Sequence, residues 1–433
     1  MLAGLMSLAA CSNDEGVVAD NNGAEQQFTI TLASSGDRAT RAATDRTLES
    51  EAAGQSIEKV TLVVRSQDDG ANKNKVVYIH TLDNWNGTAT NDDNGHGKKL
   101  TFTIPKADKL GAGSYVVTAV GYNEGNYTLS LPNKGDVVDK NITATTPTGA
   151  EAKEVFAGEQ KFNVTADKKI EETDASKPIQ SVDVTLHRQV AGAYGYFTSI
   201  PAKIGETAVA SIRMVSRTKN TVLTFGSFNS SFTTTDAHVM YMVNGSVPAT
   251  KTAKFLNGDE ANVLFSAKIA DWFPGGDESK DGVYDKEDTN WTNPYTTGSY
   301  LKGSVFASNF IVPFSATQGK STLELQLLDA TGNVLYAWPV KLDASNDQIS
   351  KTGETASADL FGAGTAMGFA ETADVFSLFR NHIYSIGIHK QNTTDPETPV
   401  PGTDEPTDLS KIQNVVIRVN DNWEALHHMS IDE

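Results

Sequence analysis

The chain has 433 residues, a formal net charge of −18 and 39% hydrophobic residues. The length suits two domains of ordinary size, and the hydrophobic content is that of a globular protein. The negative charge argues against a nucleic-acid-binding surface, because phosphate contacts need clustered lysine and arginine side chains. A single cysteine leaves no disulfide framework within the chain.

The first segment, residues 1–11, is an apolar stretch that ends in that cysteine. The ten residues before the cysteine are too few to span a bilayer. The order Leu8-Ala9-Ala10-Cys11 matches a lipobox, in which a signal peptide is cleaved and the new N-terminal cysteine is acylated, for example with palmitate. The alternative interpretation is a chance apolar start with an inert cysteine. The sequence therefore predicts lipidation at Cys11.

The second segment, residues 12–46, begins with a strand signal. Residues 27–33 alternate apolar and polar side chains, as a β-strand with one buried face does. Phe28, Ile30 and Leu32 fall on the expected inner face.

A polar stretch with Arg38, Arg41 and Arg46 follows this strand. Small polar residues in an exposed loop are good protease substrates, whereas the alternative is a solvated linker with scattered charge. We expect a cut after Arg46 first, because it leaves the shorter tail before the next strand, and after Arg41 second. Either cut would remove Cys11 and the strand together, which would release the membrane anchor and open a groove in a sheet.

Two body segments, 47–190 and 191–390, contain short apolar runs separated by polar turns. Such runs predict strands at 57–66, 75–82, 100–104, 114–122 and 182–191 in the first segment, and at 208–215, 222–225, 238–243, 261–267, 322–328, 334–342 and 379–389 in the second. We therefore predict an all-β protein with two tandem β-sandwich domains.

Residues 391–411 form a spacer of proline, threonine and acidic residues, which we expect to be extended and solvated. The last segment, 412–433, opens with another strand signal between Ile412 and Trp423. An isolated strand is not stable in water, so this strand must complete a sheet, either of its own body or of a neighbouring copy.

The apolar rhythm of this last strand matches that of the first strand. Val415, Ile417 and Val419 lie on one face, as Phe28, Ile30 and Leu32 do. We therefore expect it to serve as a donor strand that fills the groove of another copy after cleavage.

Several motifs give the chain a resemblance to a known family. They are the lipobox cysteine, Thr40-Arg41-Ala42, the L-H-R-Q-V-A of Leu186–Ala191, the R-N-H-I-Y-S-I of Arg380–Ile386, the spacer and the terminal N-D-N-W. With them the chain resembles the fimbrillins, the pilin subunits of the type V pili of Bacteroidales-type bacteria.

The resemblance implies domains of transthyretin-like topology and export as a lipoprotein of the outer membrane. It also implies maturation by a trypsin-like, arginine-specific protease and polymerisation by donor-strand exchange with other pilin subunits. The expected location is a cell-surface fimbrium that supports adhesion. A cleavable N-terminus together with a tethered C-terminal strand favours a stalk subunit over an anchor or a tip subunit.

Other functions have weaker signals. Residues 277–288 resemble a calcium loop, with Asp288 at its last position, although an acidic surface loop is the plainer interpretation. Tryptophans 85, 272, 291 and 338 could line a glycan site of a non-polymerising adhesive lipoprotein, but scattered indoles are more often core residues. No nucleophile or acid–base set assembles from the sequence, so we expect neither enzymatic activity nor a cofactor.

Overall fold

The computed structural model describes residues 26–32, 57–91, 98–138, 142–146, 152–166, 170–171, 181–217, 219–225, 255–258, 261–295, 300–313, 323–342, 383–387, 389, 404–410 and 415–420. Within these residues the fold is all-β, as predicted. The helices among them are short: α1 (Trp85–Thr88), α3 (Ile269–Trp272) and two 3-10 turns, Gly70–Asn72 and Lys106–Asp108. None of these described helices has the length and hydropathy needed to cross a membrane.

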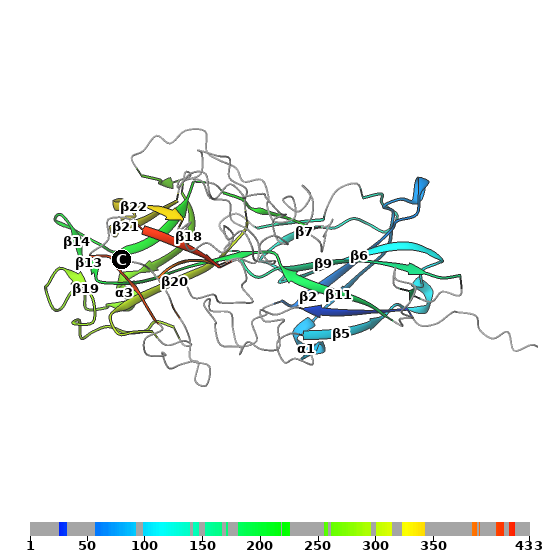
Figure 1. Cartoon of the computed structure of the whole chain (residues 1–433), viewed down its shortest axis with the longest axis horizontal. Coiled ribbons are helices and arrows are strands. Elements are labelled where there is room, and N and C mark those ends of the chain that lie inside the picture. Colours follow the sequence, from blue (N-terminus) through cyan, green and yellow to red (C-terminus); the bar gives the residue numbers. More distant parts are fainter. Residues whose placement is uncertain are drawn as a thin grey trace, which may run out of the picture.

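The first large sheet is built from the N-terminal half of the chain (Figure 1). Its strands are β1 (Gln27–Leu32), β2 (Lys59–Ser66), β3 (Val76–Leu82), β4 (Thr90–Asn91), β5 (Lys98–Thr103), β6 (Gly113–Tyr122), β9 (Phe156–Val164), β10 (Ile170–Glu171) and β11 (Ser181–Arg188). They run in the order β3-β2-β6-β9-β11-β1-β5-β4, with β10 beside β9. Their pairings are antiparallel except that of β1 with β11, which is parallel.

The second large sheet is built from the C-terminal half. Its strands are β12 (Ala191–Thr198), β16 (Ser211–Ser216), β18 (Asn262–Lys268), β20 (Ser304–Ile311), β21 (Leu323–Leu328), β22 (Val334–Leu342), β23 (Ile383–Ile386), β24 (Thr407–Asp408) and β25 (Val415–Asn420). Their order is β18-β16-β21-β22-β25-β23-β12-β20, with β24 beside β12. The described chain passes from one large sheet to the other between Arg188 and Ala191, while the domain limits given above stay a prediction.

A smaller sheet joins the two halves of the chain. It consists of β7 (Thr128–Ser130), β8 (Ile142–Thr145) and β17 (Val222–Phe225), in the order β17-β8-β7. Leu223 and Phe225 of β17 are buried in one apolar cluster with Val120 of β6 and Ala157 of β9. The halves therefore share a core as well as backbone hydrogen bonds.

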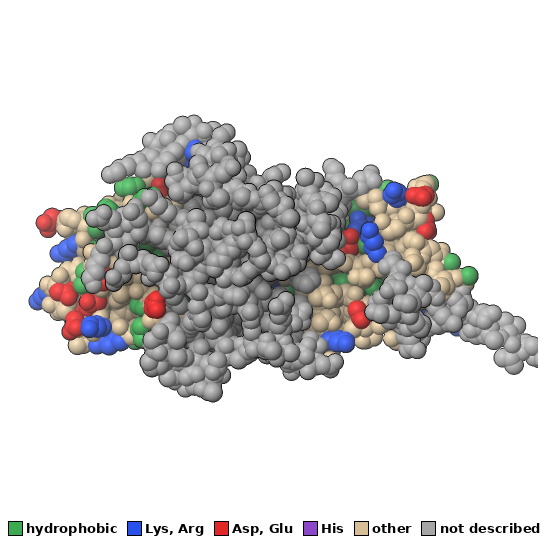
Figure 2. All heavy atoms as spheres, in the orientation of Figure 1, with side chains coloured by type: hydrophobic (Ala, Val, Ile, Leu, Met, Phe, Trp, Pro, Cys, Tyr) green, Lys and Arg blue, Asp and Glu red, His purple; other side chains and the backbone are tan. Residues whose placement is uncertain are grey.

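Two further ribbons lie in the C-terminal half. β13 (Ile200–Pro201) pairs with β19 (Val283–Tyr284), and β14 (Lys203–Ile204) pairs with β15 (Thr207–Ala208). Figure 2 shows acidic and basic side chains interspersed at this end of the molecule.

Some strands carry no alternating pattern and were not predicted. In β12, the run Ala191–Phe197 is buried at every position, because both faces of the strand are covered. A strand that is buried on both faces loses the period-two signal on which sequence-based prediction depends. The strands β9 and β20 were missed as well, and the strand expected at 238–243 lies outside the described residues.

The expectation that the spacer is solvated throughout is wrong for its described part, residues 404–410. Leu409 is 2% exposed, and its backbone N–H donates to Thr198 O of β12 at 3.0 Å. Asp404 is buried with its Oδ2 atom 3.4 Å from His389 Nδ1. A single leucine and a paired carboxylate dock the end of a segment whose overall composition indicates a solvated linker.

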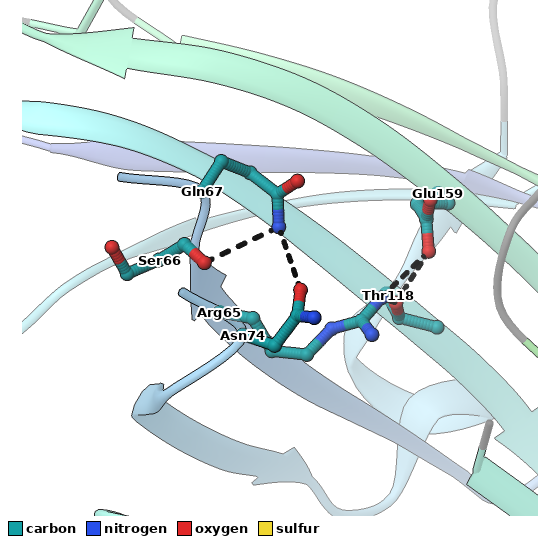
Figure 3. A network of polar contacts seen from close by, with 6 residues as sticks. All are labelled: Arg65, Ser66, Gln67, Asn74, Thr118 and Glu159. Carbon is teal, nitrogen blue, oxygen red and sulfur yellow. Dashed lines mark hydrogen bonds and ion pairs between the residues drawn. The ribbon is translucent and has the colours of Figure 1, made fainter. Parts of the chain in front are cut away.

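An ion pair ties three neighbouring strands of the first sheet together. Arg65 Nη2 on β2 donates to Glu159 Oε2 on β9 at 2.9 Å, and Thr118 Oγ1 on β6 donates to the same oxygen at 3.0 Å (Figure 3). The side chains of Arg65 and Glu159 are only 13% and 9% exposed. Little solvent screens this contact, so loss of one partner leaves a poorly hydrated charge.

We predict that Glu159→Ala lowers the free energy of unfolding by about 1–3 kcal/mol, because Arg65 loses its charged acceptor. Urea denaturation of the full chain measures the loss. Glu124→Ala serves as the control: Glu124 pairs with Lys59, but its side chain is 70% exposed, so the expected loss is below about 1 kcal/mol. Equal losses in the two variants would contradict the role assigned to the partly buried pair.

Candidate functional site

The first strand occupies an internal position in its sheet, between β11 and β5. We call this position the β1 slot. All six residues of β1 are in register with β11, from Gln27 beside Ser181 to Leu32 beside Leu186. The same six residues are in antiparallel register with β5. Loss of β1 would therefore leave two strands with unpaired backbone groups facing one another.

The predicted inner face of β1 is buried. Phe28 and Ile30 are fully buried, and the Phe28 ring packs edge-on against Phe162 with ring centroids 5.5 Å apart. The backbone of Leu32 is paired on both sides, but its side chain lies outside the described part of the chain. Thr29, expected on the outer face, is only 5% exposed, and its Oγ1 atom lies 3.1 Å from Thr101 Oγ1.

A residue just before the strand contributes as much as those within it. Gln26 is fully buried, and its side-chain amide pairs with the backbone of Leu110. The Nε2 atom donates to Leu110 O at 3.0 Å, and Oε1 accepts from Leu110 N at 2.8 Å. Gln26 O also accepts from Ile104 N at 2.8 Å. Sequence reasoning missed this residue, because a glutamine that precedes a strand usually indicates a solvated boundary.

One wall of the β1 slot, β11, is held by close backbone packing and a buried ion pair. A Cβ atom on Gly158 of β9 would lie 2.0 Å from Thr185 O, so only glycine permits this approach. At the end of β11, Arg188 Nη2 donates to Glu154 Oε1 at 2.8 Å, and both side chains are almost fully buried. The wall formed by β11 is thus fixed independently of β1.

The other wall, β5, depends more on β1. Among the described strands, the short β4 lies beyond it at the edge of the sheet, and its pairing with β5 covers two residues. The ring of His80 on β3 stacks on the ring of Phe102 on β5, with centroids 4.3 Å apart. This contact holds β5 against β3. Burial lowers the pKa of His80, so this ring is neutral at pH 7 and stacks as an uncharged aromatic group. Burial likewise raises the pKa of the neighbouring Tyr78 to about 12.

The last strand, predicted as a donor, completes its own sheet in the single chain. β25 pairs in parallel with β22, with Val415 beside Val340, and antiparallel with β23, with Val419 beside Tyr384 (Figure 1). Of the two outcomes that the sequence left open, the structure of one chain has the strand folded back on its own body. Like β1, it lies between one parallel and one antiparallel neighbour.

The other residues predicted to function lie outside the described part of the chain. They are the lipidation residue Cys11, the cleavage residues Arg41 and Arg46, and the donor-strand residues Ile412 and Trp423. Their roles stay predictions.

The acidic loop at 277–288 is stabilised by its own backbone. The Asp288 carboxylate, which is fully buried, accepts from the backbone N–H groups of Glu278, Ser279 and Asp285 at 2.8, 3.1 and 3.1 Å. Asp277 similarly accepts from Lys280 N at 2.7 Å. Among the described residues no group of His, Cys, Asp or Glu is placed to hold a metal ion.

The tryptophans are mainly core residues. Trp85, Trp272 and Trp338 are 0%, 1% and 4% exposed, and the half-buried Trp291 packs against Trp272. Indole faces that are already covered by protein offer no surface on which a sugar ring could stack.

Comparisons with known proteins give likenesses to solved structures only. No protein-family model matches the chain, and no curated protein sequence matches it. A candidate cell adhesion protein from Parabacteroides distasonis is 11% identical with a TM-score of 0.43, over 92% of this chain and 96% of that one. A fimbrial assembly protein from the same species is 12% identical with a TM-score of 0.34, over 87% and 99%.

The fimbrial anchor protein Mfa2 from Porphyromonas gingivalis is 11% identical with a TM-score of 0.33, over 92% of this chain and 98% of that one. The names of all three concern fimbriae or cell adhesion, the class expected from the sequence motifs. Because their TM-scores are below 0.5, these likenesses by themselves assign the chain neither a detailed topology nor a function.

We predict that Phe28→Ala destabilises the uncleaved chain by about 3–5 kcal/mol, because it removes a fully buried ring and leaves a cavity against Phe162. Thr31→Ala, on the half-buried face of the same strand, should cost less than about 1 kcal/mol. Urea denaturation monitored by limited proteolysis measures both variants. If Phe28→Ala were as stable as Thr31→Ala, β1 would not be part of the core.

Proposed function

We propose that this protein is a structural subunit of cell-surface fimbriae, of the kind that the fimbrillins represent. It is exported as a lipoprotein acylated at Cys11 and cut after Arg46 or Arg41. The cut releases β1, and the C-terminal strand of another copy enters the β1 slot. Repetition of this step produces a polymer that supports adhesion.

The observation that carries the proposal is the position of β1. An internal strand with both edges paired comes from a segment whose covalent link to the rest of its sheet runs through residues 33–56. That link contains Arg38, Arg41 and Arg46. A cut there leaves β1 held by hydrogen bonds and apolar contacts alone, which a competing strand of similar pattern replaces one for one.

The pairing of β25 supports its part as the donor. Its backbone forms an internal strand with a parallel neighbour on one side and an antiparallel neighbour on the other, which is the pairing that the β1 slot requires. While it completes its own sheet it is unavailable to others, so donation requires that it leave β22 and β23. Main-chain pairing then supplies affinity, and alternate side chains supply register.

The free energy that holds β1 in its slot favours exchange for another strand over spontaneous release of β1. Burial of Phe28 and Ile30 contributes about 1.5–3 kcal/mol each, and ladder hydrogen bonds contribute about 0.5–1.5 kcal/mol net apiece. A strand held by this sum does not leave without a replacement. Val415, Ile417 and Val419 regain a large part of the same burial.

The alternative, a glycan-binding lipoprotein that does not polymerise, has less support. It needs exposed aromatic faces, whereas three of the four tryptophans considered for it are buried. An anchor or tip subunit of a fimbria remains an outcome of the experiment below.

We predict that treatment of the full-length lipoprotein with a trypsin-like protease gives a new N-terminus at Thr47 or Ala42, together with filaments in electron micrographs. Arg38→Ala, Arg41→Ala and Arg46→Ala combined should abolish both, because the link to β1 then holds no arginine and stays intact. Removal of residues 412–423 should abolish filaments while cleavage continues.

Arg38→Ala is the matched control, since it removes an arginine of the same segment and should leave cleavage and filaments unchanged. A protein that keeps acylated Cys11 under these conditions and forms no filaments would contradict the stalk role and favour an anchor subunit.

A further inference from the structure

The Gln26–Leu110 contact sets a requirement on any strand that replaces β1. The proposal developed here rests on the function proposed above. Leu110 is 4% exposed, and its backbone N–H and C=O groups are both bonded to the Gln26 amide. Removal of Gln26 with β1 leaves this buried donor and acceptor without those partners. An incoming strand that lacks an amide side chain at this point loses two hydrogen bonds in a buried setting.

The C-terminal segment carries an amide at the matching distance from its apolar residues. Residues 26–32 read Q-Q-F-T-I-T-L, and residues 413–419 read Q-N-V-V-I-R-V. We propose that the donor strand enters the β1 slot in the register that puts Gln413 in the place of Gln26, its side-chain amide pairing with the Leu110 backbone of the receiving copy. Val415, Ile417 and Val419 then take the places of Phe28, Ile30 and Leu32.

Registers shifted by one residue are excluded by charge and polarity. One such shift puts Arg418 in the fully buried place of Ile30. The opposite shift puts Asn414 in the fully buried place of Phe28. A one-residue slip exchanges the two faces of a strand, and an unpaired charge or amide in a core is costly.

Registers shifted by two residues keep the same face of the donor strand toward the core, but they move the Gln413 amide away from the Leu110 backbone. One puts Gln413 itself in the apolar place of Phe28, against the Phe162 ring. The other puts Val415 opposite Leu110, where it offers no hydrogen bond. Of the five registers within two residues, only the proposed one satisfies both the apolar face and the Leu110 backbone.

The remaining positions are compatible with this register. Val416 replaces Thr29, which has nearly the same shape, and the hydroxyl partner that it leaves, Thr101, is exposed to water. Arg418 replaces the half-buried Thr31. Lys99 of β5 is in register with position 31, and Asp183 of β11 lies two residues before Thr185, the residue in register with position 31 on that strand. Repulsion of Arg418 by Lys99 and its attraction to Asp183 therefore offset each other.

Valine is smaller than phenylalanine, so the donor fills the place of Phe28 less completely than β1 does. Apolar packing therefore favours the proposed register less strongly for the donor strand than it favours the register of β1. The two hydrogen bonds of Gln413 then account for a larger share of the preference for this register.

Cysteine cross-linking in protease-matured chains tests the register directly, because cleavage removes Cys11, the only native cysteine. Thr31 is in register with Thr185, which is exposed. Thr185→Cys combined with Arg418→Cys should give a ladder of disulfide-linked subunits on non-reducing gels. Thr185→Cys with Val416→Cys or with Asn420→Cys should give at least several-fold less, since those pairs match registers shifted by two residues.

A second test removes the amide alone. Gln413→Leu replaces the amide with an apolar side chain that makes no hydrogen bonds, and we expect assembly to slow roughly tenfold, the factor that corresponds to about 1.4 kcal/mol. Lys411→Ala, outside the aligned segment, is the control and should assemble at the wild-type rate.

The two proposals fail in different ways. Wild-type filaments with cross-linking at 416 or 420, or with an unchanged rate for Gln413→Leu, would overturn the register and leave strand exchange intact. Absence of wild-type filaments after complete cleavage would overturn both.

Discussion

The hydrogen bonding of β1 along both of its edges is the interaction on which the N-terminal sheet depends. β11 and β5 face each other only through this strand, in a parallel pairing on one side and an antiparallel pairing on the other. Because backbone groups in a core must be paired, the position cannot stand empty at low cost. A strand that is required for the sheet yet linked to it through an arginine-rich segment is well suited to replacement.

The rest of the N-terminal half keeps the β1 slot in shape. The Arg188–Glu154 pair and the close approach at Gly158 fix β11, and the His80–Phe102 stack supports β5. The contacts that fix β11 do not involve β1, so they persist when it leaves, whereas β5 loses its pairing with β1. The β11 wall of the slot is thus preformed for an extended segment, which lowers the entropic cost of binding an incoming strand.

The C-terminal half has a related arrangement, with the last strand in an internal position of its own sheet. The segment before this strand, residues 404–410, packs on the C-terminal half, since Leu409 and Asp404 are buried and β24 pairs with β12. The shared sheet of β7, β8 and β17 connects the two halves by backbone pairing and a common core. The two halves are therefore joined by paired strands as well as by the chain between Arg188 and Ala191.

The sequence by itself determined the all-β class. It also determined strands whose more buried and more exposed residues alternate, such as Val76–Leu82 and Ser181–Arg188, because alternation follows directly from strand geometry. It did not predict Ala191–Thr198, where burial on both faces removes the alternation, nor the docking of residues 404–410. Only the tertiary structure decided that β1 lies between β11 and β5, because pairing across long sequence separations leaves no local signal. The role of Gln26 was decided in the same way, since its partner Leu110 is distant in sequence and is recognised through its backbone, which every residue shares.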